Sequence, residues 1–358
     1  MNRRVRIISC ICLVGLLFLF GCKEEKTPGV ASDTKTFFDT SVTLTIYGEG
    51  ADAALAVCFA RCRDLEQVFS AQNSGSELYR INKREGAGGD YDPASRTGTA
   101  EFTVSDELRD AISLGLEAYQ DTNGMFDITM LPVSDLWDFR TGRGKLPDMY
   151  LLAEEVLRVG SDYVKLDGNT LRLSNRNTLI DLGAIAKGCI SASLRDYLMS
   201  RDDVDGAILN LGGNIDVFGQ KPDGTLWQVG IQKPFGNRGE LIATVEMPKG
   251  CVISSGVYER CFNESGIFYH HILSPKDGMP VHSGISQATV IGTDDALADT
   301  LSTVCMLLGK DKSEELILEK GYQVHVLYTG SDGTLTLFDS ETGEEQGVSE
   351  GTKLHIEP

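Results

Sequence analysis

The run D-Y-V-K-L-D-G-N-T-L-R-L, Asp162 to Leu173, contains the signal that sets the fold class of this chain. Two short segments rich in Val, Leu and Thr flank Asp167-Gly168-Asn169, a combination that predicts a β-hairpin. The same arrangement recurs along the chain, where predicted strands follow one another through tight turns and predicted helices come in separate blocks. Because strands joined by tight turns pair antiparallel, this order favours the α+β class and disfavours a doubly wound parallel sheet.

Hydrophobic periodicity and turn residues predict the other elements. The predicted strands span residues 37–47, 178–182, 207–218, 226–231, 241–246, 252–255, 268–273, 323–329 and 334–338. The predicted helices span residues 51–69, 106–122, 184–199, 295–308 and 312–320, with a short helix within 75–83. Ser105 is expected to cap the helix that begins at residue 106.

The N-terminus has the features of an export signal followed by a lipid anchor. The sequence M-N-R-R-V-R supplies positive charge ahead of an apolar segment at 7–20, which is too short for a comfortable transmembrane helix. The next residues, L-F-G-C, end in Cys22 and are similar to the site where bacterial lipoproteins are lipidated. An ordinary signal peptide with an incidental cysteine is the alternative. We therefore expect a signal peptide over 1–21, lipidation of Cys22 and a flexible tether over 22–35.

Charge and length restrict the classes of partner. The 358-residue chain has a formal net charge of −19, and removal of the three signal-peptide arginines would take it to −22. Such a surface repels nucleic acid and anionic lipid, so membrane attachment should come from acyl chains and an anionic ligand needs a local cation. We expect one folded domain over 36–340 and an acidic, loose tail over 341–358. The expected location is the bacterial cell envelope, facing the periplasm or the cell exterior.

The cysteines do not predict a disulfide framework. Nine are present, three of them within the first 22 residues, and the other six lie in apolar or helical segments without a C-x-x-C pair. This pattern predicts buried thiols rather than a disulfide scaffold or a zinc site.

The run D-D-A-L-A-D-T-L-S-T-V, Asp294 to Val304, predicts a helix with an unusual polar stripe. Asp295, Asp299 and Thr303 recur at i, i+4 and i+8, beside a separate apolar stripe. A divalent cation would offset the repulsion between the carboxylates, and a carboxylate and a hydroxyl one turn apart supply two oxygen ligands of the kind Mg²⁺ prefers. In the alternative interpretation the aspartates cap the helix and Thr303 bonds back to a carbonyl of the preceding turn.

The run T-L-I-D-L-G-A-I-A-K-G, Thr178 to Gly188, predicts a strand, a bend at Gly183 and the start of a helix. This junction exposes backbone groups beside Asp181 and Lys187, an arrangement suited to phosphate or a bound acyl oxygen. A plain strand-to-helix turn with a capping aspartate explains the pattern equally well.

Three further stretches carry weaker signals. In F-Y-H-H-I-L-S-P, His270 and His271 would point to opposite faces of a strand, so one of them could reach a cleft and transfer protons. The segment from Asn123 to Phe139 is dense in aromatics and suits a planar ligand, or else covers the core. The sequence L-N-L-G-G-N-I at residues 209–215 permits a close backbone approach or merely a turn.

Taken in order, these segments resemble the ApbE family of FAD:protein FMN transferases. The resemblance spans about residues 37–338 and is carried by F-D-T-S-V-T-L, S-E-L-Y-R-I-N, G-M-F-D-I-T, I-D-L-G-A-I-A-K-G, N-L-G-G-N-I, I-S-S-G-V-Y-E-R, H-I-L-S-P-K-D-G and A-L-A-D-T-L-S-T. In one departure the family usually has Met-Gly-Thr where this chain has Phe38-Asp39-Thr40, which affects the expected contact at position 38.

The resemblance implies a fold, a ligand and a set of site residues. The implied fold is related to the T-fold, with antiparallel sheets packed against helices around a central FAD cleft and Mg²⁺ beside the pyrophosphate. The implied metal ligands are the backbone carbonyl of Ala184 and the side chains of Asp299 and Thr303, with Asp295 helping through water. The implied dinucleotide contacts are Phe38, Asn82, Met125, Phe126, Asp127, Asp181, Lys187 and Ile272. Asp299 and His271 are the implied catalytic residues, with His271 in proton transfer and His270 a weaker candidate.

The implied activity is transfer of FMN from FAD to a threonine or serine hydroxyl of an exported acceptor protein, such as a redox-complex subunit, with release of AMP. Two alternatives remain open: a Mg²⁺-dependent FAD pyrophosphatase that yields FMN and AMP, and a flavin-binding lipoprotein without catalysis. Asn82 is one position whose change could alter the balance between transfer and hydrolysis. The expected partners are thus FAD, the acceptor protein and a membrane, but no nucleic acid.

Overall fold

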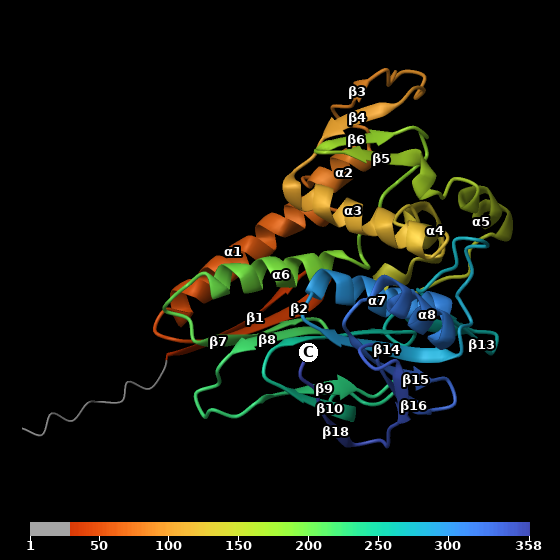
Figure 1. Ribbon diagram of the computed structural model, residues 1–358. Helices are drawn as coiled ribbons and strands as arrows, with labels where there is room; N and C mark the ends of the chain where they lie inside the picture. The colour runs from red at the N-terminus through yellow and green to blue at the C-terminus, as the bar shows by residue number, and fades with distance from the viewer. Residues whose placement is uncertain (1–28) are drawn as a thin grey trace, which may run out of the picture.

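The computed structural model describes residues 29–358, and its central element is a nine-stranded antiparallel sheet (Figure 1). Successive side chains of each strand point to opposite faces of this sheet. In spatial order the strands are β1 (Val30–Phe37), β2 (Thr40–Tyr47), β7 (Gly206–Leu211), β8 (Asn214–Gly219), β11 (Gly250–Gly256), β14 (Ile285–Gly292), β15 (His325–Gly330), β16 (Leu335–Asp339) and β17 (Glu344–Gly347).

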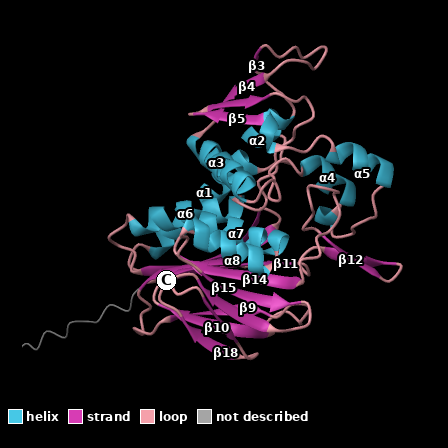
Figure 2. Ribbon diagram, turned by 45° about the vertical axis from the view of Figure 1, so that its right-hand side comes forward, coloured by secondary structure: helices cyan, strands magenta, loops and turns pink. Residues whose placement is uncertain are grey.

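Helices cover one face of this sheet and a smaller sheet covers the other (Figures 1 and 2). The covering helices are α1 (Ala51–Phe69), α6 (Ala186–Met199), α7 (Asp295–Leu308) and α8 (Lys310–Lys320). The smaller sheet has the order β18 (Thr352–His355), β10 (Leu241–Met247) and β9 (Trp227–Gln232). Two hydrophobic cores result, one on each side of the nine-stranded sheet. The chain therefore has α+β architecture, as its turn pattern predicted.

Two peripheral units complete the fold. At the top of Figure 1 stands a four-stranded sheet, in the order β3 (Gly88–Gly89), β4 (Ala100–Thr103), β6 (Thr170–Leu173) and β5 (Val164–Asp167). The predicted hairpin around Asp167-Gly168-Asn169 is confirmed as β5–β6. The second unit packs around the buried Trp137 and comprises α4 (Leu131–Trp137), α5 (Met149–Val156) and the hairpin of β12 (Cys261–Glu264) and β13 (Ile267–His270). The remaining helices are α2 (Glu77–Asn82) and α3 (Asp106–Asp121), and Ser105 caps α3 as predicted.

The structure corrects both predicted boundaries of the domain. Residues 30–35 of the tether expected over 22–35 instead belong to β1, which begins at Val30 and pairs along its length with β2. The predicted loose tail over 341–358 is wrong: β17 pairs with β16, and β18 pairs in parallel with β10. The charged residues of these strands face solvent, whereas Leu354 in β18 and Ile356 just after it are buried. The acidic composition alone therefore did not predict these two edge strands. The predicted signal peptide over 1–21 and the lipidation at Cys22 lie outside the described residues.

Two predicted strands also differ from the structure. The segment 37–47 is a hairpin rather than one strand, because Phe38 and Asp39 have φ of 53° and 57° and form its two-residue turn. The segment 178–182 belongs to no strand and pairs with no sheet. Its backbone is held instead by side chains, since Asn82 forms two hydrogen bonds with Ile180 and Arg84 donates to Thr178.

Within the described residues, no helix is both long and apolar enough to span a membrane. Six free cysteines are described, and four of them (Cys58, Cys62, Cys251 and Cys305) are buried.

Candidate active site

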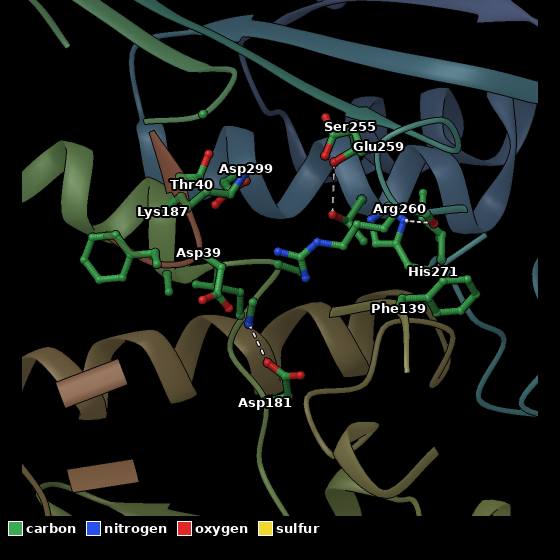
Figure 3. A pocket seen from close by; sticks show the side chains of 18 of the residues that line it. Asp39, Thr40, Phe139, Asp181, Lys187, Ser255, Glu259, Arg260, His271 and Asp299 are labelled. Atoms are coloured by element: carbon green, nitrogen blue, oxygen red, sulfur yellow. Dashed lines mark hydrogen bonds and ion pairs between the residues drawn. The ribbon is translucent and has the colours of Figure 1, made fainter. Parts of the chain in front are cut away.

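A cavity of about 1260 Å³ lies where several turns from distant parts of the chain meet (Figure 3). The turn at Phe38 and Asp39 and the turn at Gly212 and Gly213 form one side, because β2 and β7 are neighbours. The approach is close: a Cβ on Gly212 would lie 2.0 Å from Thr40 Oγ1, so the paired glycines serve both as a turn and as a close contact. The other walls come from loop 125–140, segment 181–187, the β11–β12 turn, residues 271–275 and helix α7.

The predicted metal ligands Ala184, Asp299 and Thr303 all line this cavity. The carbonyl oxygen of Ala184 accepts no hydrogen bond from any described residue, because the amide of Gly188, four residues later, donates to Asp299 Oδ2 at 2.9 Å instead. The second oxygen, Asp299 Oδ1, lies 3.9 Å from Lys187 Nζ. An orphaned carbonyl, a carboxylate with one oxygen available and a hydroxyl are oxygen donors of the kind that hold Mg²⁺. These residues therefore fit the implied cation.

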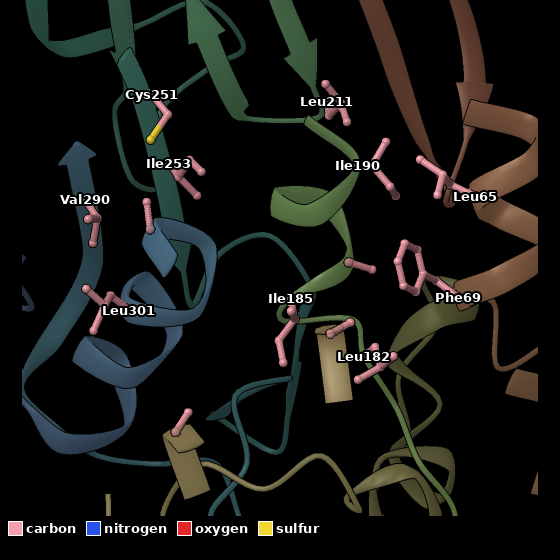
Figure 4. Close-up of a cluster of buried hydrophobic side chains, with 14 of the residues drawn as sticks. Leu65, Phe69, Leu182, Ile185, Ile190, Leu211, Cys251, Ile253, Val290 and Leu301 are labelled. Carbon is pink, nitrogen blue, oxygen red and sulfur yellow. The ribbon is translucent and has the colours of Figure 1, made fainter. Parts of the chain in front are cut away.

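The position of the bend at Ala184 is set by its buried neighbours and by one glycine. Leu182 and Ile185 are 1% and 0% exposed and anchor the bend in the core (Figure 4). Helix α6 approaches α7 closely at Gly188, where a Cβ would lie 2.4 Å from the carbonyl oxygen of Asp295 and 2.8 Å from Asp299 Cβ. Glycine is thus required for the bend to lie beside the late helix.

The alternative interpretation of the α7 stripe does not hold for Thr303. The residue that bonds back to the Asp299 carbonyl is Ser302, at 2.8 Å, whereas Thr303 Oγ1 lies 3.3 Å from Ser255 Oγ at the cavity wall. The N-cap is Asp294, whose side chain accepts from the amide of Leu297.

The charge of the cavity wall is negative. Among the described residues, eight acidic side chains line it (Asp39, Glu66, Asp127, Asp135, Asp138, Asp181, Glu259 and Asp299) against four basic ones (Arg140, Lys187, Arg238 and Arg260). Burial raises the pKa of Glu259, which Lys187 and Arg260 partly offset. A dianionic ligand in this cavity needs further positive charge, which a divalent cation would supply.

The tandem histidines have different surroundings, as the strand alternation predicted. His270 is 4% exposed, and both ring nitrogens are engaged: Nε2 with the carbonyl of Val281 at 3.1 Å, and Nδ1 with the amide of Ile272 at 3.3 Å. His271 lines the cavity, and its Nδ1 lies 3.3 Å from the carbonyl of Arg260. Burial and the charge of Arg260 lower the pKa of His271 to about 3, so its ring is neutral at pH 7.

The remaining predicted nucleotide contacts divide into two groups. Phe38, Met125, Phe126, Asp127, Asp181, Lys187 and Ile272 line the cavity as expected. Lys187 Nζ donates to Asn214 Oδ1 at 2.8 Å and Asp181 Oδ1 accepts from the amide of Gly183 at 2.9 Å, so both side chains are fixed. Asp127 also shapes its own loop, because Thr129 and Ser161 donate to it.

Two predicted site residues, Asn82 and Asp295, lie outside the described cavity wall. The amide of Asn82 is buried and is used in its two bonds to Ile180, so it holds the segment before Asp181 rather than a ligand. Asp295 is 0% exposed and pairs with Arg195 on the far side of the contact between α6 and α7. Neighbouring side chains enclose this carboxylate away from the cavity wall, and its expected help to the metal through water stays a prediction.

Several cavity residues were not predicted. They are Ser255, Tyr258, Glu259, Arg260, Arg140 and Arg238. The first four lie in I-S-S-G-V-Y-E-R, one of the motifs in which the chain resembles the ApbE family. The signal was therefore present, since a Tyr-Glu-Arg triplet after a buried strand places three polar side chains at its end.

Comparison with solved structures identifies the fold. The flavinyl transferase ApbE of Pseudomonas stutzeri in its apo form matches with a TM-score of 0.72 and 24% identity, over 91% of this chain and 95% of that one. The ApbE protein of Thermotoga maritima matches with a TM-score of 0.74 and 24% identity, over 88% of this chain and 98% of that one. The fold is thus that of the ApbE flavin transferases.

Sequence comparison gives the family itself. The model of the ApbE family matches residues 38–328. A FAD:protein FMN transferase of Treponema pallidum is 30% identical over 337 residues, which cover 88% of this chain and 88% of that protein. The chain belongs to the ApbE family.

Proposed function

We propose that this protein transfers FMN from FAD to a serine or threonine hydroxyl of an exported acceptor protein and releases AMP. The observation that carries the proposal is that Ala184, Asp299, Thr303 and His271, from distant parts of the chain, line one cavity. Related proteins named FAD:protein FMN transferase support the same reaction. The cavity volume of about 1260 Å³ is ample for a dinucleotide.

In the proposed reaction the acceptor oxygen attacks the FMN-side phosphorus of FAD. A new P–O bond forms, the bond to the bridging oxygen breaks, and AMP leaves with that bonding pair. The hydroxyl proton passes to Nε2 of His271, which is the free ring nitrogen because Nδ1 faces the Arg260 carbonyl. Lys187 and Arg260 line the same cavity, where positive charge favours the anionic transition state.

A divalent cation, for which we propose Mg²⁺, would be held by the Ala184 carbonyl, Asp299 and Thr303. When bound, it supplies positive charge to the phosphate oxygens during bond cleavage. The protein's own contribution is to hold these donors in place, through the Gly188 amide on Asp299 and the buried Leu182 and Ile185 beside the bend.

The decisive experiment incubates the full-length, detergent-solubilised protein with FAD, Mg²⁺ and a panel of exported redox proteins. Mass spectrometry should find an FMN-sized gain on a serine or threonine of one acceptor, with one AMP released per transfer. The Asp299→Ala variant serves as the catalytic control and should give neither product. Absence of mass gain on every acceptor, with stoichiometric AMP release in their absence, would instead establish the pyrophosphatase. Tight FAD binding without AMP release, alone or with acceptors, would establish a carrier.

We also propose that Cys22 is lipidated and anchors the protein to a membrane of the cell envelope, with the cavity facing the periplasm or the exterior. The sequence L-F-G-C after a short apolar segment supports this location. The Cys22→Ala variant should move from the membrane fraction to a soluble exported fraction. Retention in the membrane fraction would contradict the anchor.

A further inference from the structure

Arg260 is positioned by the same backbone hydrogen bonds that position the candidate base. Arg260 directly precedes β12. Because Cys261 pairs with His270 in the β12–β13 hairpin, Arg260 lies opposite His271. The amide of His271 donates to the Arg260 carbonyl at 3.1 Å, and His271 Nδ1 lies 3.3 Å from the same oxygen. Since a carbonyl only accepts hydrogen bonds, Nδ1 carries the ring proton, and Nε2 of the neutral ring is the acceptor.

The guanidinium of Arg260 extends into the cavity (Figure 3). Two other cations that line the cavity already have partners, because Arg140 pairs with Asp135 and Lys187 bonds to Asn214. No ion pair or side-chain hydrogen bond engages the Arg260 guanidinium among the described residues. Five donors in a rigid plane remain available to an anion, and this geometry suits two oxygens of one phosphate.

We propose that Arg260 links substrate charge to the base: its guanidinium binds the FMN-side phosphate of FAD while its carbonyl holds the His271 ring beside that phosphate. The inference rests on the proposed function for the identity of the ligand and deepens it by adding a phosphate-binding residue. The side chain and the backbone of one residue then align the group under attack with the atom that receives the proton.

This arrangement makes the basicity of His271 respond to FAD. Burial and then the charges of Arg260, His270 and Lys187 lower the pKa of His271, while the Arg260 carbonyl raises it. The other ring that packs against His271 belongs to Phe139, which carries no charge. A phosphate on Arg260 offsets that charge, so the pKa of His271 rises when FAD binds and the ring becomes a stronger base. Loss of the guanidinium should raise the pKa of His271 even without FAD.

The test compares Arg260→Gln and Arg260→Lys with Arg63→Gln, a matched charge change on the exposed surface of α1. FAD binding with Mg²⁺ is followed by flavin fluorescence, and inorganic pyrophosphate is used as a competitor. The His271 ring is titrated by NMR in the free protein. Because charge-assisted hydrogen bonds to phosphate contribute about 1.5–3 kcal/mol, Arg260→Gln should weaken FAD binding by about tenfold or more. It should also raise the pKa of His271 and make pyrophosphate a poorer competitor.

Arg260→Lys keeps the charge and loses the planar pair of donors. It should bind FAD with intermediate affinity and leave the His271 titration near that of the wild type, while Arg63→Gln should change neither property. An unchanged FAD affinity in Arg260→Gln, or an unchanged His271 titration in that variant, overturns the inference. If Arg260→Gln does not fold, an unchanged FAD affinity in Arg260→Lys also overturns the inference. FAD affinity and the His271 titration can both be measured without turnover. If the wild-type protein binds FAD but neither transfers FMN nor hydrolyses FAD, the proposed function is refuted and the inference about Arg260 is still tested.

Discussion

Two aspartates one turn apart on helix α7, Asp299 and Asp295, have opposite surroundings. Asp299 lies at the cavity wall, with one oxygen held by the Gly188 amide and the other 3.9 Å from Lys187 Nζ. Asp295 is enclosed with Arg195, whose guanidinium also lies 3.6 Å from Asp216. The first region is open to a ligand and the second is closed by protein.

The difference shows that a polar stripe on a helix acquires its role from the element that crosses it. Helix α6 presents Gly188 to one end of the stripe and Arg195, two turns later, to the other. Where α6 has no side chain, a carboxylate oxygen remains available. Where it has an arginine, the carboxylate is neutralised and buried, and burial raises the pKa of Asp295 to about 6.

The comparison is tested most severely by matched changes in the two aspartates. Asp299→Asn keeps an acceptor for the Gly188 amide but removes the charge beside Ala184. Because a metal-held charge contributes several kcal/mol, the rate of AMP release should fall by about 10³-fold. Thermal unfolding with and without Mg²⁺ should show the loss of metal-dependent stabilisation. Asp295→Asn should retain most of the wild-type rate, and an equal loss in both variants would contradict the distinction.

Removal of the arginine tests the closed region. Arg195→Gln leaves Asp295 and Asp216 buried without their cation, so the free energy of unfolding should fall by about 3–5 kcal/mol. Urea unfolding followed by circular dichroism measures the effect, with Arg63→Gln on the exposed surface as the control. A loss no larger than that of the control would show that these carboxylates are paired or hydrated in some other way.

The boundary between the two regions is tested by Gly188→Ala. Its Cβ would lie 2.4 Å from the Asp295 carbonyl oxygen, so α6 must move away from α7 and Ala184 from Asp299. A displacement of about 1 Å in a catalytic arrangement lowers rates by about 10²-fold. We expect that loss in AMP release, with partial recovery at high Mg²⁺. A wild-type rate would mean that the close approach of the helices does not set the metal geometry.

The smallest expected effect is a pH dependence that belongs to the closed region. The folded pKa of Asp295 is about 6 against an ordinary value of 3.8, so the folded state binds more protons between these values. Its contribution to stability is therefore fully present below the unfolded pKa and declines as pH rises through the folded pKa. Relative to wild type, Asp295→Asn should gain stability between about pH 4 and pH 7, as measured by urea unfolding across this range. A constant difference would show that Asp295 keeps an ordinary pKa.

The elements with strong periodicity could be predicted from the sequence, and central strands with polar residues could not. Helices α1, α3 and α7 and the β5–β6 hairpin agree with their predicted positions. Strand β14, at residues 285–292 near the centre of the large sheet, was missed because I-S-Q-A-T-V-I-G neither alternates nor forms an apolar run. Its polar side chains find partners only in the folded protein: Gln287 accepts from Tyr258, and Thr289 bonds with Ser254.

The sequence by itself determined the antiparallel α+β class, the helical stripe with Asp299 and Thr303, and the separation of His270 from His271, because periodicity and turn chemistry are local. Only the tertiary structure decided which of those residues meet. It brought Ala184 and Asp299 to one cavity, with α6 close to α7 at Gly188, enclosed Asp295 with Arg195, and used the amide of Asn82 on Ile180. Such outcomes depend on how distant elements cross, and no spacing along one chain segment specifies a crossing.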